Sequence, residues 1–171
     1  MEGTNKRIFT ALLAASMFML LMGGVSAASV SLGSNINAYT KGQLATFFAT
    51  VKVTVNEKFK VNYMTFKIYD SKKKAVETCM FKSDGTKISG CNAVKYIIPI
   101  DPERHNVWGY HYGKDLKYKI VVDTAKLKEG DYKGRLGAHV QLAKKFKDFY
   151  SGYVSFKIVK YKPHVHPKKV R

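Results

Sequence analysis

The chain has 171 residues, about the size of one domain, which argues against a multidomain enzyme. Apolar residues make up 46% of it and charged residues 25%, a composition that argues against collagen-like, low-complexity and wholly disordered chains. The charge balance is unusual, because 30 Lys and Arg stand against 12 Asp and Glu, for a formal net charge of +18. Such a chain attracts polyanions.

The amino terminus predicts an export signal over residues 1–27. The positive pair Lys6–Arg7 precedes the mostly apolar run Ile8–Met22, and the small residues of Val25–Ala27 fit the peptidase that removes such signals. Cleavage would start the mature chain at Ala28 and leave a secreted or cell-surface protein with no membrane span. The alternative is an uncleaved membrane anchor, against which the glycine pair after the apolar run argues.

The two cysteines, Cys79 and Cys91, both lie in the exported part, twelve positions apart. The pair Asp84-Gly85 between them is typical of a hairpin turn, because both residue types tolerate a positive φ. We therefore expect a disulfide that joins paired strands or staples a loop. A redox pair or a metal thiolate site is disfavoured, since the spacing lacks the CxxC arrangement.

Alternating apolar and polar residues predict an all-β fold. With no helices to connect parallel neighbours, about seven strands form an antiparallel β-sandwich or barrel. The expected strands lie near residues 47–55, 64–68, 76–81, 94–100, 116–122, 132–142 and 154–158. Pro99 places its strand at a sheet edge or makes it end there. The domain spans residues 28–161, and a basic tail follows at 162–171.

The stretch from Leu127 through Gly130 and its Asp neighbour to Tyr132 resembles the immunoglobulin-like and fibronectin type III-like sandwiches. In that superfamily the tyrosine opens the penultimate strand, and its hydroxyl bonds back to the preceding corner. The resemblance implies an immunoglobulin-like β-sandwich, an architecture that secreted microbial proteins usually employ for binding or structure. The cysteines are too close for the inter-sheet bridge of antibody domains, and Trp108 does not lie between them. The resemblance therefore concerns architecture and not a named family.

Catalytic motifs are absent from the sequence, so we expect no enzyme activity and no cofactor. It contains no GxSxG, HExxH, P-loop or GxGxxG pattern. Asp101 and Glu103 could form a glycosidase pair, but nothing predicts separate environments for the two carboxylates.

His164 and His166 in the proline-bracketed tail are a weak candidate for metal binding. Two ligands are too few, and the position of a third, from among the other histidines, does not follow from the sequence. A disordered basic tail is the favoured interpretation.

Basic and aromatic residues together predict a binding surface. Outward positions of the expected strands carry more Lys and Arg than solubility requires. The segment Trp108–Lys114 adds three aromatic rings and two glycines, and such rings stack on sugars or bases. The three rings stand at alternate positions and would point to one side of a strand. The alternative is therefore that they continue a buried strand face. The predicted ligand-binding residues are Arg104, Trp108, Tyr110, Tyr112, Lys114, Lys117, Lys119, Lys133 and Arg135.

The favoured function is a secreted, non-enzymatic binding or adhesion module that attaches to a polyanionic surface, such as an acidic cell-envelope polymer. One alternative is a structural subunit of an extracellular filament or surface layer, in which strands such as Ala28–Leu32 add to a neighbour's sheet edge. The other is extracellular nucleic-acid binding through Tyr and Lys.

Overall fold

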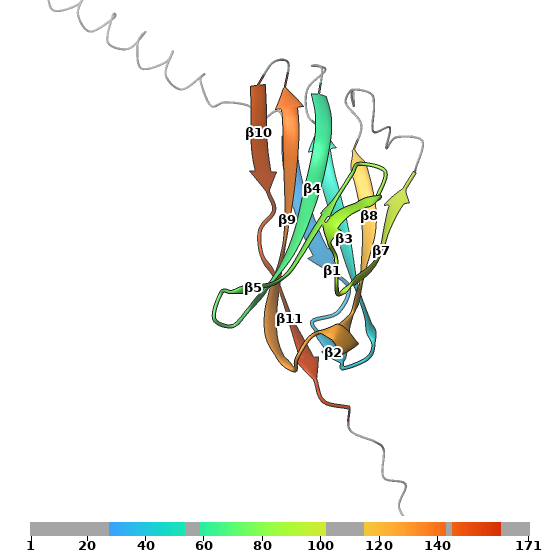
Figure 1. Cartoon of the computed structure of the whole chain (residues 1–171), viewed down its shortest axis with the longest axis vertical. Coiled ribbons are helices and arrows are strands. Elements are labelled where there is room, and N and C mark those ends of the chain that lie inside the picture. Colours follow the sequence, from blue (N-terminus) through green and yellow to red (C-terminus); the bar gives the residue numbers. More distant parts are fainter. Residues whose placement is uncertain (1–27, 54–58, 102–114, 143–144, 162–171) are drawn as a thin grey trace, which may run out of the picture.

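The computed structural model describes residues 28–53, 59–101, 115–142 and 145–161 (Figure 1). In this part of the chain the elements are β1 Ala28–Ser34, β2 Ala38–Thr40, β3 Leu44–Val53, β4 Phe59–Asp70, β5 Ala75–Phe81, β6 Lys87–Gly90, β7 Val94–Ile100, β8 Leu116–Asp123, the 3₁₀ turn η2 Thr124–Lys126, β9 Gly130–Leu142, β10 Lys145–Tyr150 and β11 Val154–Val159. These residues include no helix long and apolar enough to cross a membrane. The predicted signal 1–27 and tail 162–171 lie outside them.

The strands form two sheets, as an antiparallel sandwich requires. The smaller sheet has the order β1-β3-β8-β7, and the larger has the order β2-β11-β9-β4-β5-β6, with β10 also beside β9. Among the described pairings, that of β11 with β2 is parallel and the others are antiparallel. The all-β antiparallel prediction is confirmed.

Each of the expected strands is present, but the expected number, about seven, is too low for the eleven strands described. The additional strands are β1, β2, β6 and β10. They lack a clear apolar alternation, because β2 has three residues and β6 has no buried residue.

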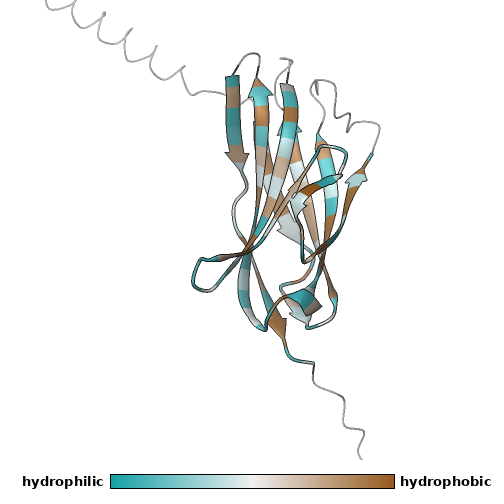
Figure 2. Cartoon of the chain, viewed as in Figure 1, coloured by the Kyte–Doolittle hydropathy of each residue, from teal (hydrophilic) through white to brown (hydrophobic). Residues whose placement is uncertain are grey.

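Aromatic side chains join the two sheets across a common core. Phe47 on β3 lies 5.3 Å from Phe66 on β4 and 5.1 Å from Phe156 on β11, measured between ring centroids. At the other side of the core, Phe81 on β5 lies 5.7 Å from Tyr118 on β8. All five rings are buried, and bands of opposite hydropathy alternate along the strands that carry them (Figure 2).

The corner before β9 contains the hydrogen bond that the sequence resemblance implied. The Tyr132 hydroxyl donates to the Lys128 carbonyl at 2.8 Å. Burial, and then the charge of Asp70, raise the pKa of Tyr132, which favours the protonated hydroxyl that donates this bond. The preceding segment forms only the short turn η2, as expected.

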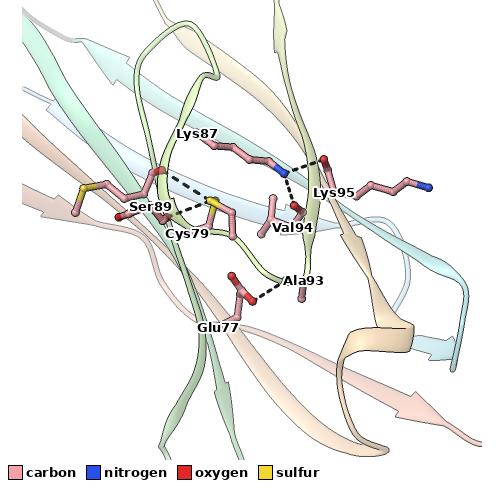
Figure 3. Close-up of a disulfide and its surroundings, with 9 residues drawn as sticks. Glu77, Cys79, Lys87, Ser89, Ala93, Val94 and Lys95 are labelled. Carbon is pink, nitrogen blue, oxygen red and sulfur yellow. Dashed lines mark hydrogen bonds between the residues drawn. A yellow bond between two sulfur atoms is a disulfide. The ribbon is translucent and has the colours of Figure 1, made fainter.

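Cys79 and Cys91 form a disulfide, so this prediction is confirmed (Figure 3). Cys79 lies on β5, opposite Gly90 of β6, and the Asp84-Gly85 turn connects the two strands. Gly90 has a φ of 67°, and a Cβ there would collide with the carbonyl of Thr78. Glycine is therefore required beside the disulfide.

The β5–β6 hairpin reaches across to the smaller sheet. The buried Tyr118 hydroxyl donates to the Ser83 carbonyl at 2.7 Å. Lys87 Nζ donates to the carbonyls of Val94 and Lys95, at 2.6 and 3.0 Å, where β7 begins (Figure 3). β7 is an edge strand, as Pro99 predicted, and the lysine occupies two of its backbone acceptors.

The amino-terminal strand is not a free arm. All of β1, from Ala28 to Ser34, pairs antiparallel with β3 of the same chain. The segment Ala28–Leu32 is thus already part of a sheet, and only its second edge could receive a neighbour.

Candidate functional site

The structure describes four of the predicted ligand-binding residues and divides them between the two sheets. Lys117 and Lys119 lie on β8 in the smaller sheet, whereas Lys133 and Arg135 lie on β9 in the larger sheet. All four point away from the core, because the residues that alternate with them are buried. The two pairs therefore occupy opposite faces of the sandwich. Arg104, Trp108, Tyr110, Tyr112, Lys114, His164 and His166 lie outside the described residues.

Arg135 lies at the centre of an aromatic cluster on the outer face of the larger sheet. Its guanidinium carbon is 4.6 Å from the ring centroid of Tyr150 and 5.0 Å from that of Tyr153. Its Nε donates to the Ser151 carbonyl at 3.2 Å, and its Nη1 donates to the Tyr153 hydroxyl at 3.4 Å. These contacts hold the planar cation in one orientation before any ligand arrives.

Two tyrosines flank Arg135 because β10 and β11 follow one another along the same side of β9 (Figure 1). At their junction Ser151 is buried; its N–H donates to the Leu136 carbonyl at 2.8 Å, and its hydroxyl accepts from the Leu136 N–H at 2.9 Å. Gly137 provides space for the Tyr150 ring, because a Cβ at Gly137 would lie 2.9 Å from Tyr150 Cε1.

A second stack continues the cluster along β10. The His139 ring stacks on Tyr63, with centroids 4.7 Å apart, and on Phe146, with centroids 5.4 Å apart. Its Nδ1 is 2.7 Å from Asp148 Oδ1, which fixes the plane of the imidazole. His139 is thereby engaged with its sheet neighbours.

These two stacks form a continuous surface that we call the aromatic face. Its members are Tyr63, Tyr69, Arg135, His139, Phe146, Tyr150 and Tyr153. Phe146, Tyr150 and Tyr153 expose 60%, 55% and 53% of their surfaces, more than packing in a core would leave. Lys67 pairs with Arg135 across the strands, and Lys133 pairs with Tyr69, so two lysines lie beside the rings and the arginine.

A hollow of about 950 Å³ opens at the end of the aromatic face. Its wall includes Tyr69 and Tyr153, whose rings meet edge to face with centroids 5.8 Å apart. Lys73, Lys133 and Lys157 also line it. The hollow therefore offers both aromatic and cationic groups to a ligand.

The acidic side chains near the aromatic face already have partners. Asp148 is bound to His139, and Asp131 lies 3.9 Å from Lys157 Nζ. Asp70 Oδ1 accepts two backbone N–H groups of the β4–β5 turn, both at 2.9 Å. These carboxylates serve local structure, and the lysines make the surroundings positive.

Phe146, Tyr150 and Tyr153 were not among the binding residues predicted from the sequence. The signal was the alternation of Phe146, Asp148 and Tyr150, which places these residues on one side of a strand. That side faces solvent, whereas in a typical strand the apolar side of the alternation faces the core.

Comparison with known proteins supports the fold. No family model and no curated protein matches the chain. The C-terminal domain of Wzt superposes with a TM-score of 0.50 at 12% identity, over 80% of this chain and 75% of that one. At this identity the similarity shows a common β-sandwich-like fold alone.

Two further solved structures are more distant. Spo0M, a sporulation control protein from Bacillus subtilis, gives a TM-score of 0.41 at 10% identity, over 78% of this chain and 50% of that one. A family 123 glycoside hydrolase from Clostridium perfringens, described for glycolipid glycan hydrolysis, gives 0.39 at 13% identity, over 80% of this chain and 28% of that one. Neither similarity is close enough to indicate a function.

Proposed function

We propose that the chain is a secreted, non-enzymatic, immunoglobulin-like module that binds an acidic polysaccharide of the cell envelope through the aromatic face. The observation that carries the proposal is Arg135, held between the half-exposed rings of Tyr150 and Tyr153. The predicted export signal and the disulfide support secretion. The corner bond of Tyr132 supports the immunoglobulin-like class.

The Arg135 guanidinium recognises an anionic group of the polymer. Arg135 uses Nε and Nη1 within the protein, at 3.2 and 3.4 Å, so its other N–H donors remain to pair with a carboxylate or sulfate. Because neighbouring rings already hold the side chain, binding costs little additional conformational entropy.

The rings supply a flat support for a polymer. Phe146, Tyr150 and Tyr153 follow one another along β10 and toward β11, so successive sugar rings can stack on successive aromatic rings. Lys67 and Lys133 lie beside them and attract further anionic groups of the same chain.

Affinity electrophoresis in gels that contain polygalacturonate tests the proposal, with neutral dextran as the reference polymer. We expect Arg135→Gln to weaken polygalacturonate binding at least tenfold, because the paired anion loses its partner. Arg135→Lys keeps the charge but not the planar fork, and should give an intermediate loss.

Lys119→Gln is the matched control, since it removes one positive charge from the opposite sheet. It should change binding less than about twofold. Equal losses for Arg135→Gln and Lys119→Gln would show general charge attraction instead of a site. Displacement of the polysaccharide by a much lower concentration of single-stranded DNA would favour the nucleic-acid alternative.

A further inference from the structure

The outer face of the smaller sheet carries a second exposed surface, on the side of the sandwich opposite the aromatic face. Its apolar side chains include Phe48, Tyr96, Ile98 and Ile100, which are 46%, 51%, 45% and 39% exposed. Side chains of this kind on a flat sheet usually mark an interaction surface. We call this surface the apolar-basic face.

Lysines are interleaved with the apolar residues of this face. In the strand register, Lys119 of β8 lies between Phe48 of β3 and Ile98 of β7. One row further, Lys117 pairs with Ile100. The face therefore alternates apolar and cationic groups across neighbouring strands.

The acidic residue of these strands lies away from the centre of the sheet. Within the described parts of β1, β3, β7 and β8, the one carboxylate is that of Asp123, where β8 ends. Its Oδ1 accepts the Ala125 N–H at 3.0 Å and caps the turn η2. The centre of the apolar-basic face thus carries uncompensated positive charge.

We propose that the apolar-basic face binds a lipid surface that contains anionic headgroups. The positive charge complements such a surface, and lysines of this kind extend toward phosphates while neighbouring apolar groups enter the interface. A membrane also suits this face, because the hollow beside Tyr69 and Tyr153 and a second one beside the turn at Lys126–Gly130 are both lined, among the described residues, by side chains outside it. A second copy of the chain fits poorly, since two such faces would bring the lysines of both copies into one interface with no carboxylate at its centre.

A tryptophan reporter tests contact at this face in the full chain. Trp108 is the only tryptophan of the sequence, so Trp108→Phe with Tyr96→Trp leaves one tryptophan, on the apolar-basic face. With vesicles that contain brominated phosphatidylglycerol, we expect strong quenching of its fluorescence. Vesicles of brominated phosphatidylcholine alone should quench it much less.

The matched comparison is Trp108→Phe with Tyr153→Trp, which places the reporter on the opposite face. Residues 1–27 are the same in both proteins, so attachment through them cannot distinguish the two reporters. Quenching at position 96 but not at 153 supports the proposal. Equal quenching at both positions, or none at 96, overturns it. If the emission of the tryptophan at position 96 is blue-shifted without vesicles and the protein sediments as a dimer, the face binds a second copy of the chain instead.

Charge variants give a second readout that leaves the apolar groups in place. Lys117→Gln and Lys119→Gln should each lower partition onto anionic vesicles about fivefold, the value expected for one basic residue near such a surface. Lys133→Gln, on the opposite face, removes the same charge and should have a small effect. Equal effects of all three variants would contradict the proposed orientation. Unchanged thermal melting of each variant verifies that the fold is retained.

Discussion

Removal of the disulfide should destabilise the domain without unfolding it. The double substitution Cys79→Ala/Cys91→Ala breaks the bond between β5 and the end of β6. The cross-link spans a sequence separation of 12, for which the chain-entropy model gives a loss of about 3 kcal/mol in the free energy of unfolding. A change of this size corresponds to a lower melting temperature by roughly 10 °C in a domain of this length.

Other contacts at the hairpin survive the substitution, which is why a folded protein is expected. The Tyr118 hydroxyl still reaches the Ser83 carbonyl, and Lys87 still holds the start of β7. Glu77 Oε2 also accepts the Ala93 N–H at 2.8 Å, independently of the sulfur atoms (Figure 3).

Equilibrium urea unfolding, with and without dithiothreitol, measures the effect. The unsubstituted protein should lose about 3 kcal/mol when reductant is added, and the double variant should not respond to reductant. A difference below about 1 kcal/mol between oxidised protein and variant would refute the reasoning that the bond constrains the unfolded chain. A change in the urea m-value alone would show that the unfolded state is altered in another way.

Three smaller changes test individual contacts. Tyr132→Phe removes the corner hydrogen bond and should cost about 1 kcal/mol in urea unfolding, whereas an unchanged midpoint would mean that the corner contributes nothing. Glu77→Ala should cost about 1–3 kcal/mol, because the buried Ala93 N–H loses its acceptor, and Glu77→Gln should cost less since an amide oxygen can replace the carboxylate. Gly137→Ala should displace the Tyr150 ring and weaken polygalacturonate binding, and full retention of affinity would argue against a role for that ring.

Local patterns were sufficient to predict much of the fold. Strict alternation predicted the buried side of β3, and Pro99 predicted an edge strand. The cysteine spacing predicted the disulfide, and Tyr132 predicted the corner bond. Each of these features depends on residues close together in the sequence or on the two-residue period of a strand.

The candidate site depends on contacts that the sequence pattern does not contain. Arg135 meets Tyr150 and Tyr153 only because β10 and β11 both pair with β9, with Ser151 buried at the junction. β10 was not expected, because five of its six residues are exposed and only Phe149 is buried. A strand with so little buried surface has no inward apolar pattern to detect.

The sequence pattern also does not show which basic residues share a face of the sandwich. Alternation predicts that Lys119 and Arg135 both point outward, and this is what the structure shows. It does not predict which sheet each strand joins, and the two side chains belong to opposite faces. Strand order results from pairing between distant segments, so it is visible only in the folded chain.

Salt dependence can separate the contributions of charge and stacking at the aromatic face. Each cation that neutralises an anionic group of the polymer releases a counterion, so the logarithm of the binding constant falls with the logarithm of the salt concentration. Arg135→Gln should make this slope shallower by up to about one, because one such contact is lost. Tyr150→Ala should lower affinity at every salt concentration and leave the slope unchanged, since an uncharged ring releases no counterion. Binding to polygalacturonate measured from 50 to about 300 mM sodium chloride gives both slopes. If Tyr150→Ala changes the slope as much as Arg135→Gln does, the ring acts only by holding the arginine, and stacking on the sugar is not part of recognition.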